Sequence, residues 1–160
     1  MRRALYTIGY TGFSVQEFVS TLVESGVECL IDTREIPISR KKGFAKTALR
    51  QHLEDAGIAY RHFRQLGSPR IHRHEVRETG DYAQFFAAVR RHIETPDAAE
   101  QLQEAIQLAR SSTSCLMCCC PDWTLCHRSC LVEAIAKKHA FDFRHLQKTG
   151  SQPERRRKAA

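Results

Sequence analysis

Long apolar runs are the first feature that the sequence lacks. No stretch approaches the ~18 residues that a membrane-spanning helix needs. The beginning of the chain carries Arg2 and Arg3, but the apolar segment that follows them is too short for a secretory signal peptide. We therefore expect a cytoplasmic location and no membrane partner.

Two catalytic signatures are also absent. A phosphatase-type loop has an arginine six residues after its cysteine, but the residue six positions after Cys120 is Cys126. The zinc deaminases combine His-x-Glu with a later Pro-Cys-x-x-Cys, and the sequence lacks this pair of motifs. Neither of these two reaction classes is indicated.

Cysteine, in contrast, is abundant and concentrated. Six of the seven cysteines fall between Cys115 and Cys130. A secreted disulfide scaffold spreads its cysteines along the chain, so that each bridge closes a loop. The cysteines from Cys118 to Cys120 are consecutive, and neighbouring cysteines pair poorly because their side chains diverge. We interpret the cluster as free thiols, which leaves metal binding, catalysis and simple burial open.

Positive charge is the second excess, with a formal net charge of +7 and a pI of about 9.2. Basic residues gather in two regions of the expected domain: Arg34, Arg40, Lys41, Lys42 and Lys46 in the first, and Arg61, Arg64, Arg70 and Arg73 in the second. Residues 147–160 hold a further basic run, and we predict that they form a flexible tail. The excess favours an anionic partner, either a phosphorylated small molecule or nucleic acid.

Short apolar segments alternate with amphipathic ones, a pattern typical of parallel strands covered by helices. The expected strands are residues 5–8, 27–31, 58–63, 114–119 and 141–145. The expected helices cover about 15–25, 46–56, 96–110 and 126–139, and residues 81–93 are also amphipathic. Residues 66–80 show no clear period and are predicted to form a long loop. The fold predicted for residues 1–146 is one compact α/β domain, with a mostly parallel sheet of about five strands and helices on both faces.

In such a sheet, ligands bind beyond the carboxyl ends of the strands. Cys126 falls at the expected start of a helix, where backbone N–H groups and the helix dipole stabilise a thiolate or a bound phosphate. We predict three catalytic residues: Cys126 as nucleophile, His127 as its proton partner and Asp32 as an orienting carboxylate. The predicted anion-binding residues at the same edge are Arg34, Ser39, Arg40, Tyr60, Arg128 and Ser129.

No cofactor is predicted, although the cysteines leave a metal ion possible. Cys115, Cys118, Cys126 and His127 have ligand types suited to zinc. However, Cys115 and Cys118 are separated by an odd number of positions in an expected strand, so their side chains face opposite sides. Cys118 and Cys120 share a face. The alternative metal site is therefore Cys118, Cys120 and Cys126.

In their order along the chain, these residues resemble the domain-of-unknown-function 488 family from about Thr7 to His145. The resemblance rests on Thr7–Tyr10, Asp32–Arg34 with Pro37 and Ser39, Gly43–Phe44, Ile58–His62, Leu66–Gly67, Tyr82, Cys118 and Cys126–Ser129. It implies a compact α/β fold but supplies no reaction. The sequence departs from the family pattern in two places. Cys120 stands where an acidic residue is usual, for which nearby Asp122 could substitute, and Thr33 stands where valine is usual.

Three functions remain open at this point. The first is an enzyme that acts on a nucleotide or nucleic-acid substrate through Cys126, His127 and Arg128. The second is a non-catalytic nucleic-acid-binding module that uses only the basic regions. The third is a metal-responsive or redox-responsive cysteine site. A structural interpretation also remains, in which Cys126 is a small buried residue and Arg128 pairs with Asp32. The sequence does not indicate the oligomeric state.

Overall fold

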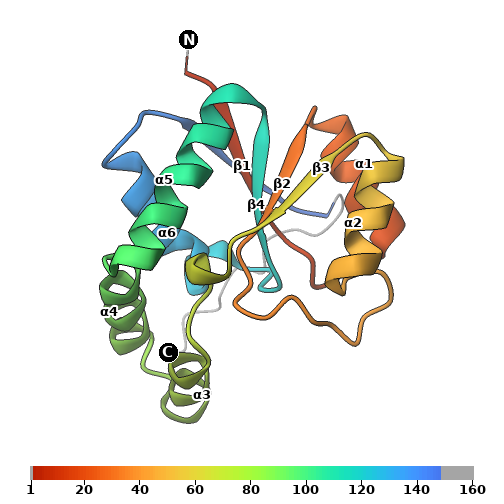
Figure 1. Ribbon diagram of the computed structural model, residues 1–160. Coiled ribbons are helices and arrows are strands. Elements are labelled where there is room, and N and C mark those ends of the chain that lie inside the picture. The colour runs from red at the N-terminus through yellow and green to blue at the C-terminus, as the bar shows by residue number, and fades with distance from the viewer. Residues whose placement is uncertain (1, 149–160) are drawn as a thin grey trace, which may run out of the picture.

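The computed structural model describes residues 2–148, which form an α/β domain around one sheet (Figure 1). Its five strands are all parallel, in the order β3-β2-β4-β1-β5, so the predicted fold class is confirmed. The strands are β1 Ala4–Gly9, β2 Cys29–Asp32, β3 Ala59–His62, β4 Ser114–Cys118 and β5 Asp142–Leu146. No helix in this part of the chain is long and apolar enough to cross a membrane.

Six α-helices and two short 3₁₀ helices connect the strands in the described part of the chain. The α-helices are α1 Val15–Glu24, α2 Lys46–Asp55, α3 Arg70–Thr79, α4 Tyr82–Ile93, α5 Pro96–Ser111 and α6 Arg128–Ala136. The 3₁₀ helices are η1 Arg64–Leu66 and η2 Trp123–Leu125. Nearly all of the predicted tail, from residue 149 onward, lies outside the described residues, so that boundary stays a prediction.

Hydrophobic side chains cover both faces of the sheet and form two clusters. Helices α1 and α2 lie on one face, and α4, α5 and α6 lie on the other (Figure 1). Phe18 and Leu53 represent the first cluster, and Leu102 and Leu131 represent the second. Every residue of β4 is buried, as expected for a central parallel strand. The sheet is thus packed on both faces, which leaves the ends of its strands as places for a functional site.

Helix α1 begins as its sequence predicts. The hydroxyl of Ser14 accepts the N–H of Glu17, and the carboxylate of Glu17 accepts the N–H of Ser14, which completes the capping box. Gly26 follows the helix with a φ of +74°, a conformation that other residues seldom adopt. Local signals of this kind explain why the ends of α1 were predictable.

The prediction of a loop over residues 66–80 is wrong, because α3 occupies most of this range. The helix has no buried residue, and one of its few apolar side chains, Ile71, is 62% exposed. An apolar stripe was therefore missing from the sequence pattern. The half-buried Val76 packs against the second hydrophobic cluster, and polar contacts add to this: Arg73 donates to the carbonyl of Ser68 and pairs with Glu35, and Gly80 ends the helix with a φ of +67°.

Candidate functional site

The carboxyl ends of β1, β4 and β2 lie side by side. Gly9 is paired with Cys118, and Asp32 is paired with Met117. Beyond Gly9, the chain stays against the end of β4, because the N–H of Tyr10 donates to the carbonyl of Cys118. A side chain at Gly9 would not fit, since its Cβ would lie 1.7 Å from the carbonyl oxygen of Cys120. The residue at position 9 thus lets the segment after β4 close over the end of β1.

Three thiols meet at this edge. The Sγ atoms of Cys118 and Cys126 are 2.8 Å apart, and the Sγ of Cys120 lies within 4.8 Å of both. Cys118 and Cys126 are buried, while Cys120 is partly exposed. Three sulfur ligands at this spacing could hold a soft metal ion, as the sequence suggested for these positions. Cys115 does not belong to this group.

The imidazole of His127 lies between Cys126 and Thr33. Its Nε2 is 3.1 Å from the carbonyl oxygen of Thr33 and 3.2 Å from the Thr33 hydroxyl, which donates its own hydrogen to the carbonyl of Met117. Both Thr33 oxygens therefore accept, so the hydrogen-bond network assigns the ring hydrogen to Nε2. Nδ1, at 3.5 Å from the Sγ of Cys126, is left as an acceptor for the thiol proton.

Arg128 is a buried cation with a side chain only 1% exposed. Its Nη1 donates to the hydroxyl of Thr7, and its Nη2 donates to the carbonyl of Cys120. Its Nε has no hydrogen-bond partner, and no carboxylate of residues 2–148 forms an ion pair with it. A buried charge requires a counter-charge. The group available for that purpose is a thiolate.

The ionisation of the cluster follows from these contacts. Burial opposes ionisation of Cys126, but hydrogen bonds from Cys118 and Cys120 and the charge of Arg128 hold its pKa well below the usual range. Burial raises the pKa of the Cys118 thiol, which stays protonated. Burial also lowers the pKa of His127, so its ring is neutral near pH 7. The pKa of Cys120 is also lowered, by contacts with Cys118 and Cys119, but Cys126 is the thiol beside Arg128, and these contacts favour its thiolate next to a neutral His127.

Asp32 belongs to a second group, centred on β2 and β3. Its carboxylate receives Nε and Nη2 of Arg34, the latter at 2.7 Å, and the hydroxyl of Tyr60 at 2.5 Å. The remaining Nη1 of Arg34 donates to the carbonyl of Phe44. Asp32 therefore pairs with Arg34 and not with Arg128. Thr33 links the two groups. It lies between Asp32 and Arg34 in the chain, and its side chain contacts His127.

The other predicted residues are distributed around these two groups. Ser39 receives a hydrogen bond from the Tyr10 hydroxyl, and Arg40 beside it is exposed. Ser129 donates from its hydroxyl to the carbonyl of Cys126 at 2.8 Å. Serine at this position thus helps to fix the turn that enters α6.

Three further side chains of the site were not among the predicted site residues. Thr7 receives a hydrogen bond from Arg128 and lies 2.6 Å from Nδ1 of His145. The ring of His145 stacks on Trp123, with centroids 3.8 Å apart. Burial lowers the pKa of His145, so its Nδ1 accepts the Thr7 hydrogen. The only available signal was a polar residue, Thr7, in an otherwise apolar strand.

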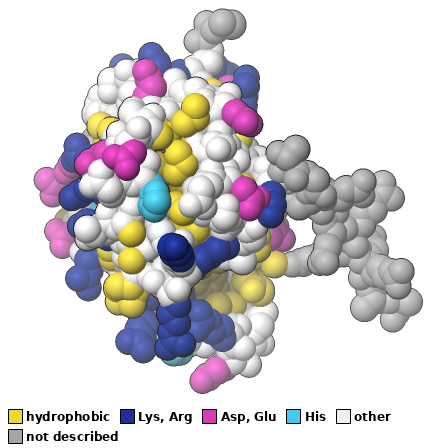
Figure 2. Space-filling model, turned by 90° about the vertical axis from the view of Figure 1, so that its right-hand side faces the viewer, with side chains coloured by type: hydrophobic (Ala, Val, Ile, Leu, Met, Phe, Trp, Pro, Cys, Tyr) yellow, Lys and Arg dark blue, Asp and Glu magenta, His cyan; other side chains and the backbone are white. Residues whose placement is uncertain are grey.

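Basic side chains surround this edge of the sheet. Figure 2 shows lysine and arginine gathered at the lower end of the visible face, the end to which the strands run in Figure 1. Exposed basic residues of the β2–α2 loop and α3 are Arg40, Lys41, Lys42, Arg70 and Arg77. An anionic ligand that approached this edge would meet an attractive field.

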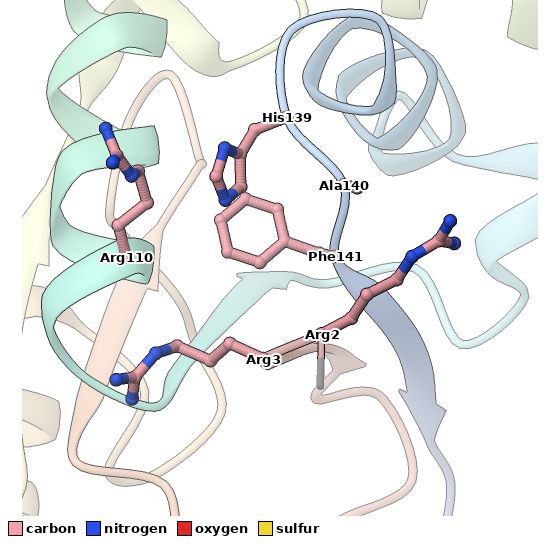
Figure 3. Close-up of a pocket in the computed structure, with 6 residues that line it drawn as sticks. All are labelled: Arg2, Arg3, Arg110, His139, Ala140 and Phe141. Atoms are coloured by element: carbon pink, nitrogen blue, oxygen red, sulfur yellow. The ribbon is translucent and has the colours of Figure 1, made fainter.

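A surface pocket of about 550 Å³ lies elsewhere, at the amino-terminal side of the sheet. It is lined by Arg2, Arg3, Arg110, His139, Ala140 and Phe141. Figure 3 shows its three guanidinium groups on different sides, pointing away from one another. They do not converge on one ligand position, so the thiol cluster remains the candidate site.

Comparison with known proteins gives one match. A family model described as "Domain of unknown function DUF488" covers residues 14–135, more than half of the chain. The matched range includes Cys118, Cys126, His127 and Arg128, but begins after Thr7 and ends before His145. No curated protein and no solved structure matches the chain.

Proposed function

The chain belongs to the DUF488 family, and we propose that it is an enzyme that uses the Cys126 thiolate on a phosphate-bearing substrate, a nucleotide or nucleic acid. The observation that carries this proposal is the buried Arg128 cation beside Cys126, with no carboxylate of the described residues to pair with it. The lowered pKa of the Cys126 thiol favours its thiolate, which is the nucleophilic form of cysteine.

Each neighbour of Cys126 has a distinct role in this proposal. Arg128 holds the negative charge on sulfur before the reaction, and its free Nε–H is available to an oxygen of the substrate. When Cys126 carries a proton, neutral His127 accepts it at Nδ1, since Thr33 holds the hydrogen on Nε2. Asp32 orients Arg34 and the end of β2 rather than the thiol.

The phosphate class of the substrate is argued from charge and position. Ser39 and Arg40 lie in the β2–α2 loop, followed by the exposed Lys41 and Lys42. Because the guanidinium of Arg34 is fully used by Asp32 and Phe44, we assign the anion contacts to Ser39 and to the exposed basic residues. Arg34 and Tyr60 support this loop from within.

Conversion of a defined substrate panel tests the proposal. Nucleoside mono-, di- and triphosphates and a short single-stranded RNA and DNA are incubated with the protein and followed by mass spectrometry. Conversion of at least one member is expected, with loss in Cys126→Ser and retention in Cys29→Ser, a buried free cysteine at the start of β2. Equal conversion by the wild type and Cys126→Ser would contradict the proposal.

A second candidate function is a soft-metal site, favoured by the three sulfurs within 4.8 Å of one another. Zinc with three thiolates carries a net negative charge, which Arg128 would balance. Metal analysis of the purified protein distinguishes this function. One zinc per chain, lost in Cys120→Ser, would favour it over the enzyme.

The salt dependence of binding distinguishes a non-catalytic nucleic-acid-binding module from the enzyme. Such binding weakens steeply with salt and does not depend on any cysteine. Affinity for the same RNA and DNA oligonucleotides, measured at two salt concentrations in the wild type and Cys126→Ser, separates this alternative from the enzyme. Tight, salt-dependent binding without conversion would favour the binding module.

A further inference from the structure

The closest pair of thiols includes one that the proposed function does not use. Cys118 ends β4, and Cys126 lies just before α6, yet their Sγ atoms are only 2.8 Å apart. Two free thiols brought together from separate elements are placed for a disulfide, which needs a small further approach to about 2.05 Å. The partner of Cys126 in such a bond would be Cys118.

Arg128 can stabilise negative charge on either sulfur. Its backbone N–H donates to the Sγ of Cys126 at 3.5 Å, and the Sγ of Cys118 lies only 2.8 Å from that sulfur. If Cys126 lost its charge through oxidation, Arg128 would again be a buried cation without a counter-charge. Transfer of that charge to Cys118 restores the pairing, and it makes Cys118 a nucleophile at the moment when Cys126 becomes an electrophile.

Burial limits the reagent that reaches this pair. Cys118 is 2% exposed and Cys126 is 1% exposed, while the partly exposed Cys120 lies on the solvent side of them. A small, neutral molecule can enter such a buried site at little cost in desolvation. Hydrogen peroxide is such a molecule, and it reacts with thiolates in preference to thiols.

We propose that Cys126 reduces hydrogen peroxide or another small hydroperoxide, and that Cys118 resolves the oxidised sulfur as a Cys118–Cys126 disulfide. This inference rests on the reactive Cys126 of the proposed function, but not on a phosphate-bearing substrate. Arg128 donates from its free Nε–H to a peroxide oxygen, which stabilises the charge that develops as the O–O bond breaks.

Each peroxide molecule oxidises the Cys118–Cys126 pair in two steps. The Cys126 thiolate forms an S–O bond with one peroxide oxygen as the O–O bond breaks, which leaves a sulfenic acid and a hydroxide ion. The hydroxide takes the proton of Cys118 and becomes water. The Cys118 thiolate then forms the S–S bond as the S–O bond breaks and hydroxide leaves. Two electrons pass from the two sulfurs to the peroxide, and an external dithiol returns them by thiol–disulfide exchange.

Peptide mapping of the oxidised protein tests the assignment. Reduced, full-length protein is treated with one equivalent of hydrogen peroxide, alkylated and digested. A Cys118–Cys126 disulfide is expected in the wild type and in Cys29→Ser. Cys118→Ser is expected to hold a sulfenic acid at Cys126, which dimedone traps. Cys126 should be oxidised about tenfold faster or more than Cys29 or Cys130 of the same chain, because its pKa is lowered while burial raises the pKa of the other two thiols.

Turnover provides the second measurement. With dithiothreitol as the dithiol, the wild type is expected to consume hydrogen peroxide, whereas Cys126→Ser is not and Cys118→Ser is slowed. A Cys120–Cys126 disulfide, or oxidation of Cys126 no faster than Cys29, would overturn the inference. If Cys126 is alkylated readily but is oxidised by peroxide no faster than Cys29, this inference is contradicted and the proposed function is not. Peroxide consumption without conversion of any nucleotide or nucleic acid removes the proposed function and leaves this inference standing.

Discussion

The Nε2 of His127 lies 3.1 Å from the carbonyl oxygen of Thr33, an atom that can only accept a hydrogen bond. This single contact determines which ring nitrogen of His127 can accept a proton. Because Nε2 carries the hydrogen, Nδ1 faces the Sγ of Cys126 without one. The backbone just after β2 thus leaves Nδ1 of His127 as a proton acceptor beside Cys126, which lies just before α6.

Thr33→Val should leave that acceptor in place. The Thr33 carbonyl is unchanged by the substitution, and the Met117 carbonyl keeps the hydrogen bond from the N–H of residue 33. Loss of the hydroxyl contacts should lower the free energy of unfolding by about 1 kcal/mol. Denaturant unfolding measures this change, and the alkylation rate of Cys126 should match that of the wild type. A large fall in that rate would show that the hydroxyl, rather than the carbonyl, positions His127.

Gly9→Ala should disturb the cluster through the backbone. The added Cβ would lie 1.7 Å from the carbonyl oxygen of Cys120 and 3.1 Å from Nη2 of Arg128. We expect a loss of about 1–3 kcal/mol or more in the free energy of unfolding, together with slower alkylation of Cys126. Gly12→Ala is the matched control, because its Cβ would meet open space although its φ of +94° is strained. Equal effects of the two substitutions on Cys126 would contradict the close approach at Gly9.

Asp32→Asn should reduce stability without changing the chemistry of the thiol. The substitution leaves the buried Arg34 without its counter-charge, which should cost about 3–5 kcal/mol. Tyr60→Phe removes one hydrogen bond to the same carboxylate and should cost about 1.5–3 kcal/mol. Per folded molecule, the pH profile of Cys126 alkylation should stay that of the wild type in both. A pH profile that shifts in Asp32→Asn but not in Tyr60→Phe would show that Asp32 influences the Cys126 thiol directly.

The stability of the protein should depend on pH through Cys126. Its folded pKa lies below the ~8.5 of an unfolded cysteine. Between these two values the unfolded state binds more protons, so the contribution rises with pH, is complete above ~8.5, and is lost as pH falls through the folded pKa. The free energy of unfolding of the wild type, relative to Cys126→Ser, should therefore rise from acid toward pH 8.5. A difference that stays flat over this range would contradict a folded-state thiolate.

The stability of the protein at higher pH depends on two further cysteines. The pKa values of Cys115 and Cys118 are raised by burial. Their contribution to stability is present below ~8.5 and is lost as pH rises above it. Stability of both proteins should therefore decline in alkaline solution, which is why the Cys126 comparison is made below pH 8.5.

The sheet was predictable because its strands are short apolar runs, such as Ser114–Cys118, set between amphipathic segments. Helix α3 was not, since its half-buried face carries His72 and Arg73 beside Val76 and so gives no apolar stripe. At the site, sequence reasoning found Cys126, His127 and Arg128 because Cys126 was expected to start a helix, although α6 begins two residues later, at Arg128. It could not find the contact of Arg128 with Thr7, because that contact requires β4 to lie beside β1, and strand order is a property of the whole sheet.

The same limit applies to Asp32. Its place at a strand end predicted that it would lie near the other polar residues. Which residue it pairs with depends on the conformation of Arg34, two positions later in the chain. Arg34 turns back onto the carboxylate and uses two of its three nitrogens there. Spacing along a sequence does not reveal such a local pairing.

The rate of Cys126 alkylation as a function of pH is the most direct test of a pre-formed thiolate held by Arg128. Iodoacetamide labelling of the native protein, followed by peptide mass spectrometry, separates Cys126 from the other six cysteines. We expect preferential labelling of Cys126 near pH 7, with its rate falling only at clearly lower pH. Arg128→Ala should slow this labelling, and Arg90→Ala, an exposed arginine paired with Glu133, should not. Circular dichroism establishes that each variant is folded. If Cys126 of the wild type stays unlabelled until the protein unfolds, or titrates as an ordinary thiol, the account is contradicted.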